Sequence, residues 1–168
     1  MKKAILGSFI TLMAFQSMAV APKDIKVKIK TTSDLEAVGH ATYIAKSESF
    51  FCKELVFNEG SPKRVPKRMY GEFSSSNQVL TIPGKIDSKC NYERLEDASI
   101  GFERPGRAEP ANVISLLYSG TIKNSKKEIK CSEVLYGRNM DELMIRCSSP
   151  GPTYVGKDGK VTLNVTMK

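Results

Sequence analysis

The most constraining stretch of this chain runs from Lys130 to Ser148, where two cysteines lie symmetrically about Asn139. Folding the stretch as a β-hairpin about Asn139 sets Cys131 directly opposite Cys147. Opposed residues on one face of an antiparallel pair lie about 4.5–5.5 Å apart, which is within disulfide range. The stretch therefore predicts a disulfide-clamped β-hairpin.

The same register sets Leu135 opposite Leu143 and Glu133 opposite Ile145. The second pair is awkward, because a carboxylate would face an apolar side chain. We expect either a polar partner for Glu133 or a β-bulge that turns it away.

Residues 1–19 have the organisation of a secretory signal peptide. A cationic start precedes an apolar run from Ala4 to Phe15, and Ser17-Met18-Ala19 supplies the small residues of a cleavage site. The run is shorter than the roughly 20 residues that span a bilayer, and we expect no membrane span in the rest of the chain. The sequence therefore predicts bacterial export, to the periplasm or the medium, with residues 20–168 forming a single mature domain.

The expected mature part contains all four cysteines and the single histidine of the chain. An even number of cysteines in an exported chain indicates disulfides, and their spacing with one histidine fits no zinc pattern. With Cys131 joined to Cys147, the second bridge is Cys52–Cys90. Loop-entropy estimates assign about 3 kcal/mol to the shorter cross-link and about 4 kcal/mol to the longer one. We expect no metal, no cofactor and no catalytic thiol.

Short segments of alternating, β-branched or aromatic residues recur along the mature chain and predict strands. They cover residues 24–31, 36–45, 49–57, 68–74, 78–82, 92–103 and 112–118. Segments 36–45 and 112–118 also fit a short helix. Asp158-Gly159 is a type I′ turn signal and predicts a last hairpin that pairs Tyr154 with Leu163 and Gly156 with Val161. Many short strands with frequent turns predict an antiparallel β-sandwich, or a small barrel, with two disulfides.

The first of these strands carries Lys26, Lys28 and Lys30 on one face. A lysine row prevents an edge strand from pairing with other chains. We therefore expect a solvated edge strand here rather than a polyanion-binding stripe.

The stretch from Asn58 to Arg68 contains two prolines, a glycine and four cations. Prolines and glycine predict an exposed, stiff loop. The four cations are the candidate site for an anionic partner: Lys63, Arg64, Lys67 and Arg68. Nucleic acid is not the expected partner, because aromatic residues are not interleaved with these charges.

Candidate catalytic groups are few. His40 is the only histidine, and we expect it to make a structural hydrogen bond in a strand. The carboxylates of Glu93, Glu96, Asp97 and Glu103 lie among arginines, which favours solvated ion pairs over an acid–base pair. No catalytic residue is assigned.

The leading hypothesis is therefore a small exported β-sandwich that acts as a non-catalytic binding module for an envelope or extracellular macromolecule. One alternative is an inhibitor of a secreted enzyme, which would present a loop to a foreign active site. The other is a small hydrolase whose site combines His40 with Glu96 or Asp97.

Overall fold

The computed structural model describes residues 24–58, 60–105, 113–136 and 142–168, so residues 1–19, predicted as a signal peptide, lie outside the described ranges. Within these ranges the chain forms twelve strands and one short 3-10 helix. They are β1 (Ile25–Thr31), β2 (Glu36–Ile44), η1 (Phe50–Cys52), β3 (Lys53–Asn58), β4 (Ser61–Pro66), β5 (Arg68–Ser74), β6 (Val79–Ile82), β7 (Arg94–Glu103), β8 (Val113–Tyr118), β9 (Ser125–Tyr136), β10 (Glu142–Ser148), β11 (Thr153–Val155) and β12 (Lys160–Met167).

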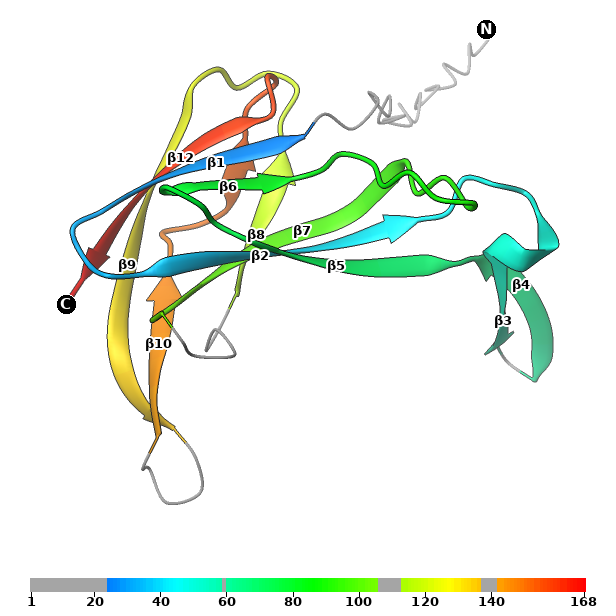
Figure 1. Ribbon diagram of the computed structural model, residues 1–168, viewed down its shortest axis with the longest axis horizontal. Helices are drawn as coiled ribbons and strands as arrows, with labels where there is room; N and C mark the ends of the chain where they lie inside the picture. The colour runs from blue at the N-terminus through cyan, green and yellow to red at the C-terminus, as the bar shows by residue number, and fades with distance from the viewer. Residues whose placement is uncertain (1–23, 59, 106–112, 137–141) are drawn as a thin grey trace, which may run out of the picture.

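Ten of these strands form two five-stranded sheets that pack as two layers (Figure 1). One sheet has the order β10-β9-β12-β1-β6, and the other has the order β11-β8-β7-β2-β5. Strands β3 and β4 form a separate two-stranded sheet. The predicted β-sandwich with its two disulfides, Cys52–Cys90 and Cys131–Cys147, is confirmed. Segments 36–45 and 112–118 are strands, not helices.

Period-two alternation builds the core between the layers. Val27, Leu80 and Leu163 of the first sheet are fully buried, as are Tyr43 and Ile100 of the second. Strands β1, β6 and β12 turn their other face outward, as alternation requires, whereas β7 also buries Ser99 on its other face.

Close packing at one point of the core depends on a glycine. A Cβ atom on Gly39 of β2 would lie 2.9 Å from Leu80 Cδ2 and 3.0 Å from Ile82 Cγ1 of β6. The backbone of β2 therefore approaches the opposite sheet more closely than any side chain would permit.

The sheets are mixed, because β12 pairs in parallel with both β1 and β9, and β11 pairs in parallel with β8. The predicted pairing of Tyr154 with Leu163 is therefore wrong. Asp158-Gly159 does form a turn, with Gly159 at φ 76°, but the strands on either side enter different sheets. Crossing between the layers buries Val155 and Val161 in one shared core, which a simple hairpin at the surface would not do.

The interpretation of β1 as an edge strand is also wrong. Strand β1 lies between β12 and β6 inside its sheet, and its lysines simply occupy the outward face. The edge is β6, which ends at Ile82 before Pro83. Proline cannot donate to a neighbouring strand, so it is compatible with this edge position.

The predicted hairpin at residues 130–148 is confirmed in its register, whereas its turn, residues 137–141, lies outside the described ranges. Cys131 pairs with Cys147 and Leu135 with Leu143. The Cα atoms of Cys131 and Cys147 are 4.0 Å apart, close to the spacing of a non-hydrogen-bonded antiparallel pair. The carbonyl of Cys131 accepts a hydrogen bond from the amide of Lys168, which follows β12, on the side of β9 that faces away from β10.

Glu133 faces Ile145 as expected, and of the two predicted solutions the structure uses the polar partner. The Arg104 guanidinium, just after β7, donates to Glu133 Oε1. Ile145 meanwhile turns into the core, where it is 6% exposed.

In the described part of the chain, no helix is long and apolar enough to cross a membrane. Two disulfides and no free cysteine indicate an oxidising compartment.

Candidate functional site: the β3–β4 hairpin

The hairpin formed by β3 and β4 stands apart from both layers of the sandwich (Figure 1). The stretch predicted as an exposed, stiff loop at residues 58–68 is exposed, but the prediction of a loop is wrong, because Ser61–Pro66 pairs with Lys53–Asn58 along its full length. Gly60, at φ 82°, supplies the left-handed conformation that the tight turn requires.

The positions of the two prolines explain how a proline-rich segment becomes a strand. Pro62 lies opposite Phe57 and Pro66 lies opposite Lys53. Since proline has no amide proton, neither pair can exchange hydrogen bonds, and the bonded pairs are the alternate ones, such as Val56 with Lys63. Both prolines therefore occupy positions whose amide would point outward, and they leave β4 a poor template for a further strand.

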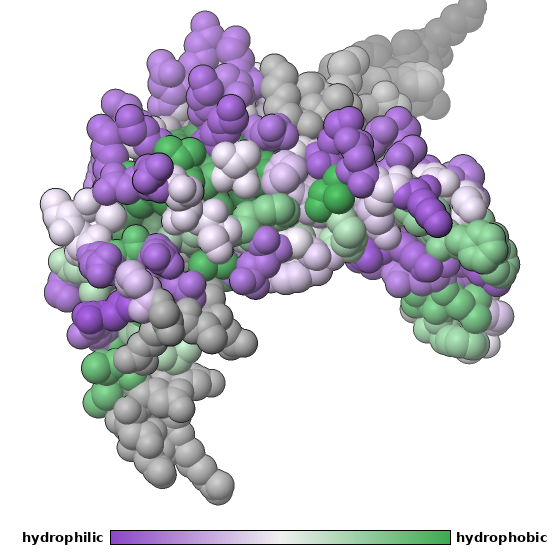
Figure 2. Space-filling view, in the orientation of Figure 1, coloured by the Kyte–Doolittle hydropathy of each residue, from purple (hydrophilic) through white to green (hydrophobic). Residues whose placement is uncertain are grey.

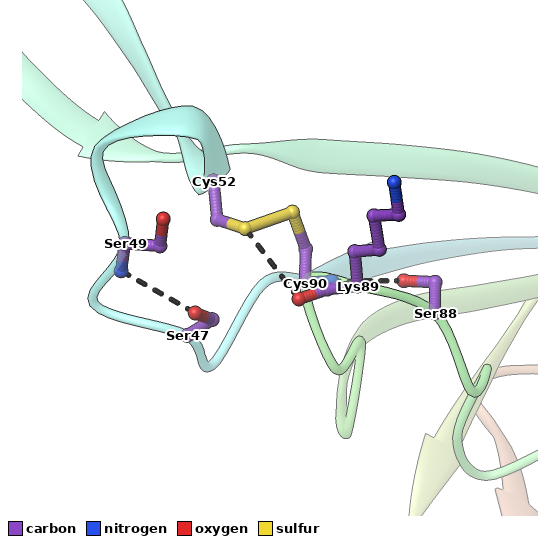
Figure 3. The surroundings of a disulfide bond; sticks show 6 residues. All are labelled: Ser47, Ser49, Cys52, Ser88, Lys89 and Cys90. Carbon is purple, nitrogen blue, oxygen red and sulfur yellow. Dashed lines mark hydrogen bonds between the residues drawn. A yellow bond between two sulfur atoms is a disulfide. The ribbon is translucent and has the colours of Figure 1, made fainter.

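An isolated two-stranded hairpin is marginally stable in water, so the root of this hairpin is essential to its order. The Cys52–Cys90 disulfide joins the root to the connection between β6 and β7 (Figure 3). Cys52 itself is 2% exposed. The Lys67 amide donates to the Cys52 carbonyl at 2.9 Å, and the Ala45 amide donates to the Lys67 carbonyl at 2.9 Å. The disulfide and two backbone bonds therefore attach the hairpin to the end of β2 and to the β6–β7 connection.

A salt bridge adds to the root at its surface. Lys53 Nζ lies 2.5 Å from Glu48 Oε2. Its hydrogen bond and positive charge lower the pKa of the Glu48 carboxyl. The contact is solvent-exposed, so we assign it a minor part in holding the hairpin.

The hairpin and the adjoining η1 expose five large apolar side chains, which we call the aromatic patch. The exposed fractions are 62% for Phe50, 80% for Phe51, 49% for Leu55, 39% for Val56 and 71% for Phe57. Figure 2 shows this apolar surface over the end of the molecule that carries β3 and β4, with hydrophilic surface beside it. A single exposed apolar residue is ordinary, but several on one projecting element are typical of an interaction surface.

The four predicted cations lie on or beside this patch. Lys63 and Arg64 project from β4, Lys67 connects β4 to β5, and Arg68 begins β5. The Arg64 guanidinium lies 3.7 Å from the centre of the Phe50 ring, a cation–π contact. One aromatic ring and one cation that are 14 positions apart in the sequence are thus in contact in space.

Only one of the four cations is neutralised by a described carboxylate. Arg68 binds Glu96 of β7 through two hydrogen bonds of 2.7 and 3.1 Å, and this contact raises the pKa of the Arg68 guanidinium. Lys63, Arg64 and Lys67 form no salt bridge with any carboxylate in the described ranges. These three cations and the aromatic patch are the candidate binding site.

The predicted catalytic candidates lie elsewhere. His40 of β2 has its Nδ1 2.5 Å from the Tyr70 hydroxyl and 3.9 Å from Glu72 Oε2. Glu96 lies at the register shift between β2 and β7 and is engaged by Arg68, while Asp97 pairs with Thr42. In the described residues, no group of three or more His, Cys, Asp or Glu side chains is arranged to hold a metal ion.

The structure also extends the predicted lysine row of β1 into a second cationic surface, which we call the lysine face; the sequence did not show that lysines of β9 and β12 join it. Strands β1, β12 and β9 are neighbours, and Lys28, Thr162 and Lys126 form one row across them. The exposed lysines of this face are Lys26, Lys28, Lys30, Lys126, Lys130 and Lys160. Unlike the hairpin, this face has no exposed aromatic side chain among these rows.

Fold and site together define the class of this protein: a disulfide-clamped β-sandwich that presents a projecting hairpin with an exposed apolar and cationic surface. Comparison of the chain with protein-family models, with curated proteins and with solved structures finds no match.

Proposed function

We propose that this chain is a non-catalytic binding module of the bacterial envelope or extracellular space, and that it docks on an anionic partner through the β3–β4 hairpin. The observation that carries the proposal is the combination of an uncovered aromatic patch with three cations that no described carboxylate neutralises. Exposed apolar area provides affinity, whereas the cations provide selectivity for negative charge and speed of encounter.

The test is a triple substitution, Lys63→Ala with Arg64→Ala and Lys67→Ala. Arg68 stays in place, because it holds Glu96. We expect weaker retention on an anionic matrix and a shallower dependence of retention on salt. Removing the same charge from the lysine face, by Lys26→Ala, Lys28→Ala and Lys126→Ala, is the matched control. Equal effects of the two triple variants would contradict docking through the hairpin.

The inhibitor of a secreted enzyme stays as a second candidate, because a hairpin rooted by a disulfide presents its tip at low entropic cost. Its distinguishing measurement is slower turnover of a secreted protease or glycosidase in the presence of the protein. The hydrolase alternative stays a prediction about His40. It requires a turnover by the parent protein that a His40→Ala variant loses.

A further inference from the structure

The two faces of the β3–β4 hairpin differ in a way that indicates what the hairpin contacts. Directly opposed residues share a face, so Leu55 and Arg64 lie together, as do Phe57 and Pro62. Phe50 joins this face through its contact with the Arg64 guanidinium. We call it the docking face. It combines aromatic, aliphatic and proline surface with a single guanidinium at its centre.

The opposite face is less apolar and carries the acidic residue of β3. Glu54 lies opposite Val65, and Val56 lies opposite Lys63. The docking face therefore contains no described acidic residue of the hairpin strands. Its lysine, Lys53, is paired with Glu48 at the root, whereas Arg64 forms no salt bridge with a described carboxylate.

From this arrangement we infer that the partner of the hairpin is an anionic lipid surface, onto which the docking face lies at the level of the headgroups. This inference rests on the proposed function and names the partner of the same site. Phe50, Leu55 and Phe57 would enter the boundary between headgroups and acyl chains, while Arg64 of the docking face would meet lipid phosphates directly. Lys63 of the opposite face and Lys67 after β4 would add positive charge close to the membrane surface.

The backbone of the hairpin sets how deep it can go. Strands with open edges cannot enter the hydrocarbon core, because unpaired backbone groups have no partner there. Pro62 and Pro66 remove two of the outward amide donors of β4, whereas Leu55 and Phe57 of β3 keep theirs. Such a hairpin suits the interface, where water and phosphate oxygens accept hydrogen bonds from the remaining donors.

Charge distinguishes a lipid surface from a second copy of this chain. Pairing two docking faces would bring two Arg64 guanidinium groups together. The surrounding apolar surface could not neutralise their two positive charges, so they would repel each other. An anionic bilayer instead satisfies the cations and the apolar side chains at once. The disulfide root holds the hairpin in place before contact, so little order has to be gained on binding.

The first experiment is vesicle co-sedimentation of the mature protein with phosphatidylcholine alone and with phosphatidylcholine mixed with phosphatidylglycerol. We expect binding to the anionic vesicles that weakens as salt rises. The triple variant Lys63→Ala, Arg64→Ala and Lys67→Ala should lose about fivefold per cation removed. The lysine-face triple variant should lose less. Binding that follows the lysine face instead would overturn the inference.

The apolar part is tested by the double variant Phe50→Ser with Phe57→Ser, for which we expect at least about tenfold weaker vesicle binding. The matched control is Leu135→Ser with Leu143→Ser on the other hairpin, where both side chains are similarly exposed. Equal losses by the two double variants would overturn the assignment to the docking face.

A third measurement does not depend on weakened binding. The chain contains no tryptophan, so Phe57→Trp introduces a single indole reporter. We expect its emission to shift to the blue with anionic vesicles, whereas Tyr118→Trp, at a site on β8 that is 49% exposed, should not respond. A response of Phe57→Trp to single-stranded nucleic acid or an acidic protein, but not to vesicles, would overturn the lipid assignment.

The failures of the two proposals are distinguishable. If vesicles are not bound but retention on an anionic matrix still depends on Lys63, Arg64 and Lys67, the assignment of a lipid partner is wrong. The proposal of a binding module is then retained. If neither vesicles nor polyanions depend on these cations, both proposals fall.

Discussion

Two hairpins project to the same side of the sandwich at opposite ends of the molecule, and each is associated with one disulfide (Figure 1). Strands β9 and β10 belong to a five-stranded sheet, and their disulfide joins residues already paired across the two strands. Strands β3 and β4 belong to neither large sheet, and their disulfide joins the root to a distant connection. The Cys131–Cys147 bridge reinforces a hairpin that a five-stranded sheet already holds. The Cys52–Cys90 bridge attaches a hairpin with which no third strand pairs.

This difference teaches that the surroundings of a cross-link decide its effect. Cys131 and Cys147 are 16 residues apart, whereas Cys52 and Cys90 are 38 apart. The longer closure restricts the unfolded chain more. It also orders a hairpin that would be marginal alone, and that hairpin carries the candidate site.

The largest expected effect comes from removing Cys52–Cys90 by a double substitution to serine. We expect a loss of about 4 kcal/mol in the free energy of unfolding, against about 3 kcal/mol for removing Cys131–Cys147. Urea unfolding measures both. Hydrogen exchange should also show loss of protection across β3 and β4 in the first variant alone. Unchanged protection of β3 and β4 would contradict the role of the disulfide as the root of that hairpin.

The second prediction concerns the body that carries both hairpins. Gly39→Ala would place a methyl group 2.9 Å from Leu80 Cδ2, so we expect about 1–3 kcal/mol of destabilisation. Because Gly39 lies in the sandwich, the loss should lower the unfolding midpoint. In hydrogen exchange, the protection of β3–β4 and of β9–β10 should fall by similar amounts. Preferential loosening of β9–β10 would show that the two hairpins do not share one rigid support.

The third prediction uses pH to weaken the contact between β2 and the end of β6, within the sandwich that carries both hairpins. The Tyr43 hydroxyl donates to the Pro83 carbonyl at 2.7 Å, and burial, followed by the negative charge of Asp24, raises the pKa of Tyr43 to about 12. An unfolded tyrosine ionises near pH 10, so stability present below pH 10 is lost as pH rises to about 12, by up to about 1.4 kcal/mol per pH unit.

Phenolate absorbance measures this titration directly, since the ionisation of Tyr43 should appear as a late component. Tyr43→Phe is the control, because it removes the late component and its share of the alkaline loss of stability. A late component that survives in Tyr43→Phe would assign it to another tyrosine.

The smallest expected effect is at the other hairpin. The Arg104–Glu133 ion pair is partly exposed, with side-chain exposures of 54% and 35%. Arg104→Ala should therefore lower the free energy of unfolding by less than about 1 kcal/mol. A loss larger than that caused by Gly39→Ala would mean that β9–β10 depends strongly on its contact with Arg104. The contrast between the two hairpins would then fail.

Local pattern was a good guide where the paired residues are close along the chain. The register of Cys131 with Cys147 followed from symmetry about Asn139. The awkward pair with Ile145 showed that Glu133 needs a polar partner or a bulge, and the structure supplies Arg104 as the partner. The same reasoning failed for strand β4, because two prolines in a short segment predict a loop. Only the register shows that Pro62 and Pro66 occupy positions whose amide would point away from β3. The candidate cations were found from sequence, but the aromatic patch beside them was not.

The sequence by itself determined most of the strands and the Cys131–Cys147 bridge, because alternation and the pairing of a hairpin act over a few residues or one turn. The Cys52–Cys90 bridge then followed by elimination, and with it the character of a cross-linked β-sandwich. Tertiary structure alone decided that β1 is an inner strand, that β12 leaves β11 for the other sheet, and that Phe50 lies against Arg64. Those outcomes depend on which distant surfaces bury each other. Burial is a property of the whole packed chain, and no short pattern encodes it.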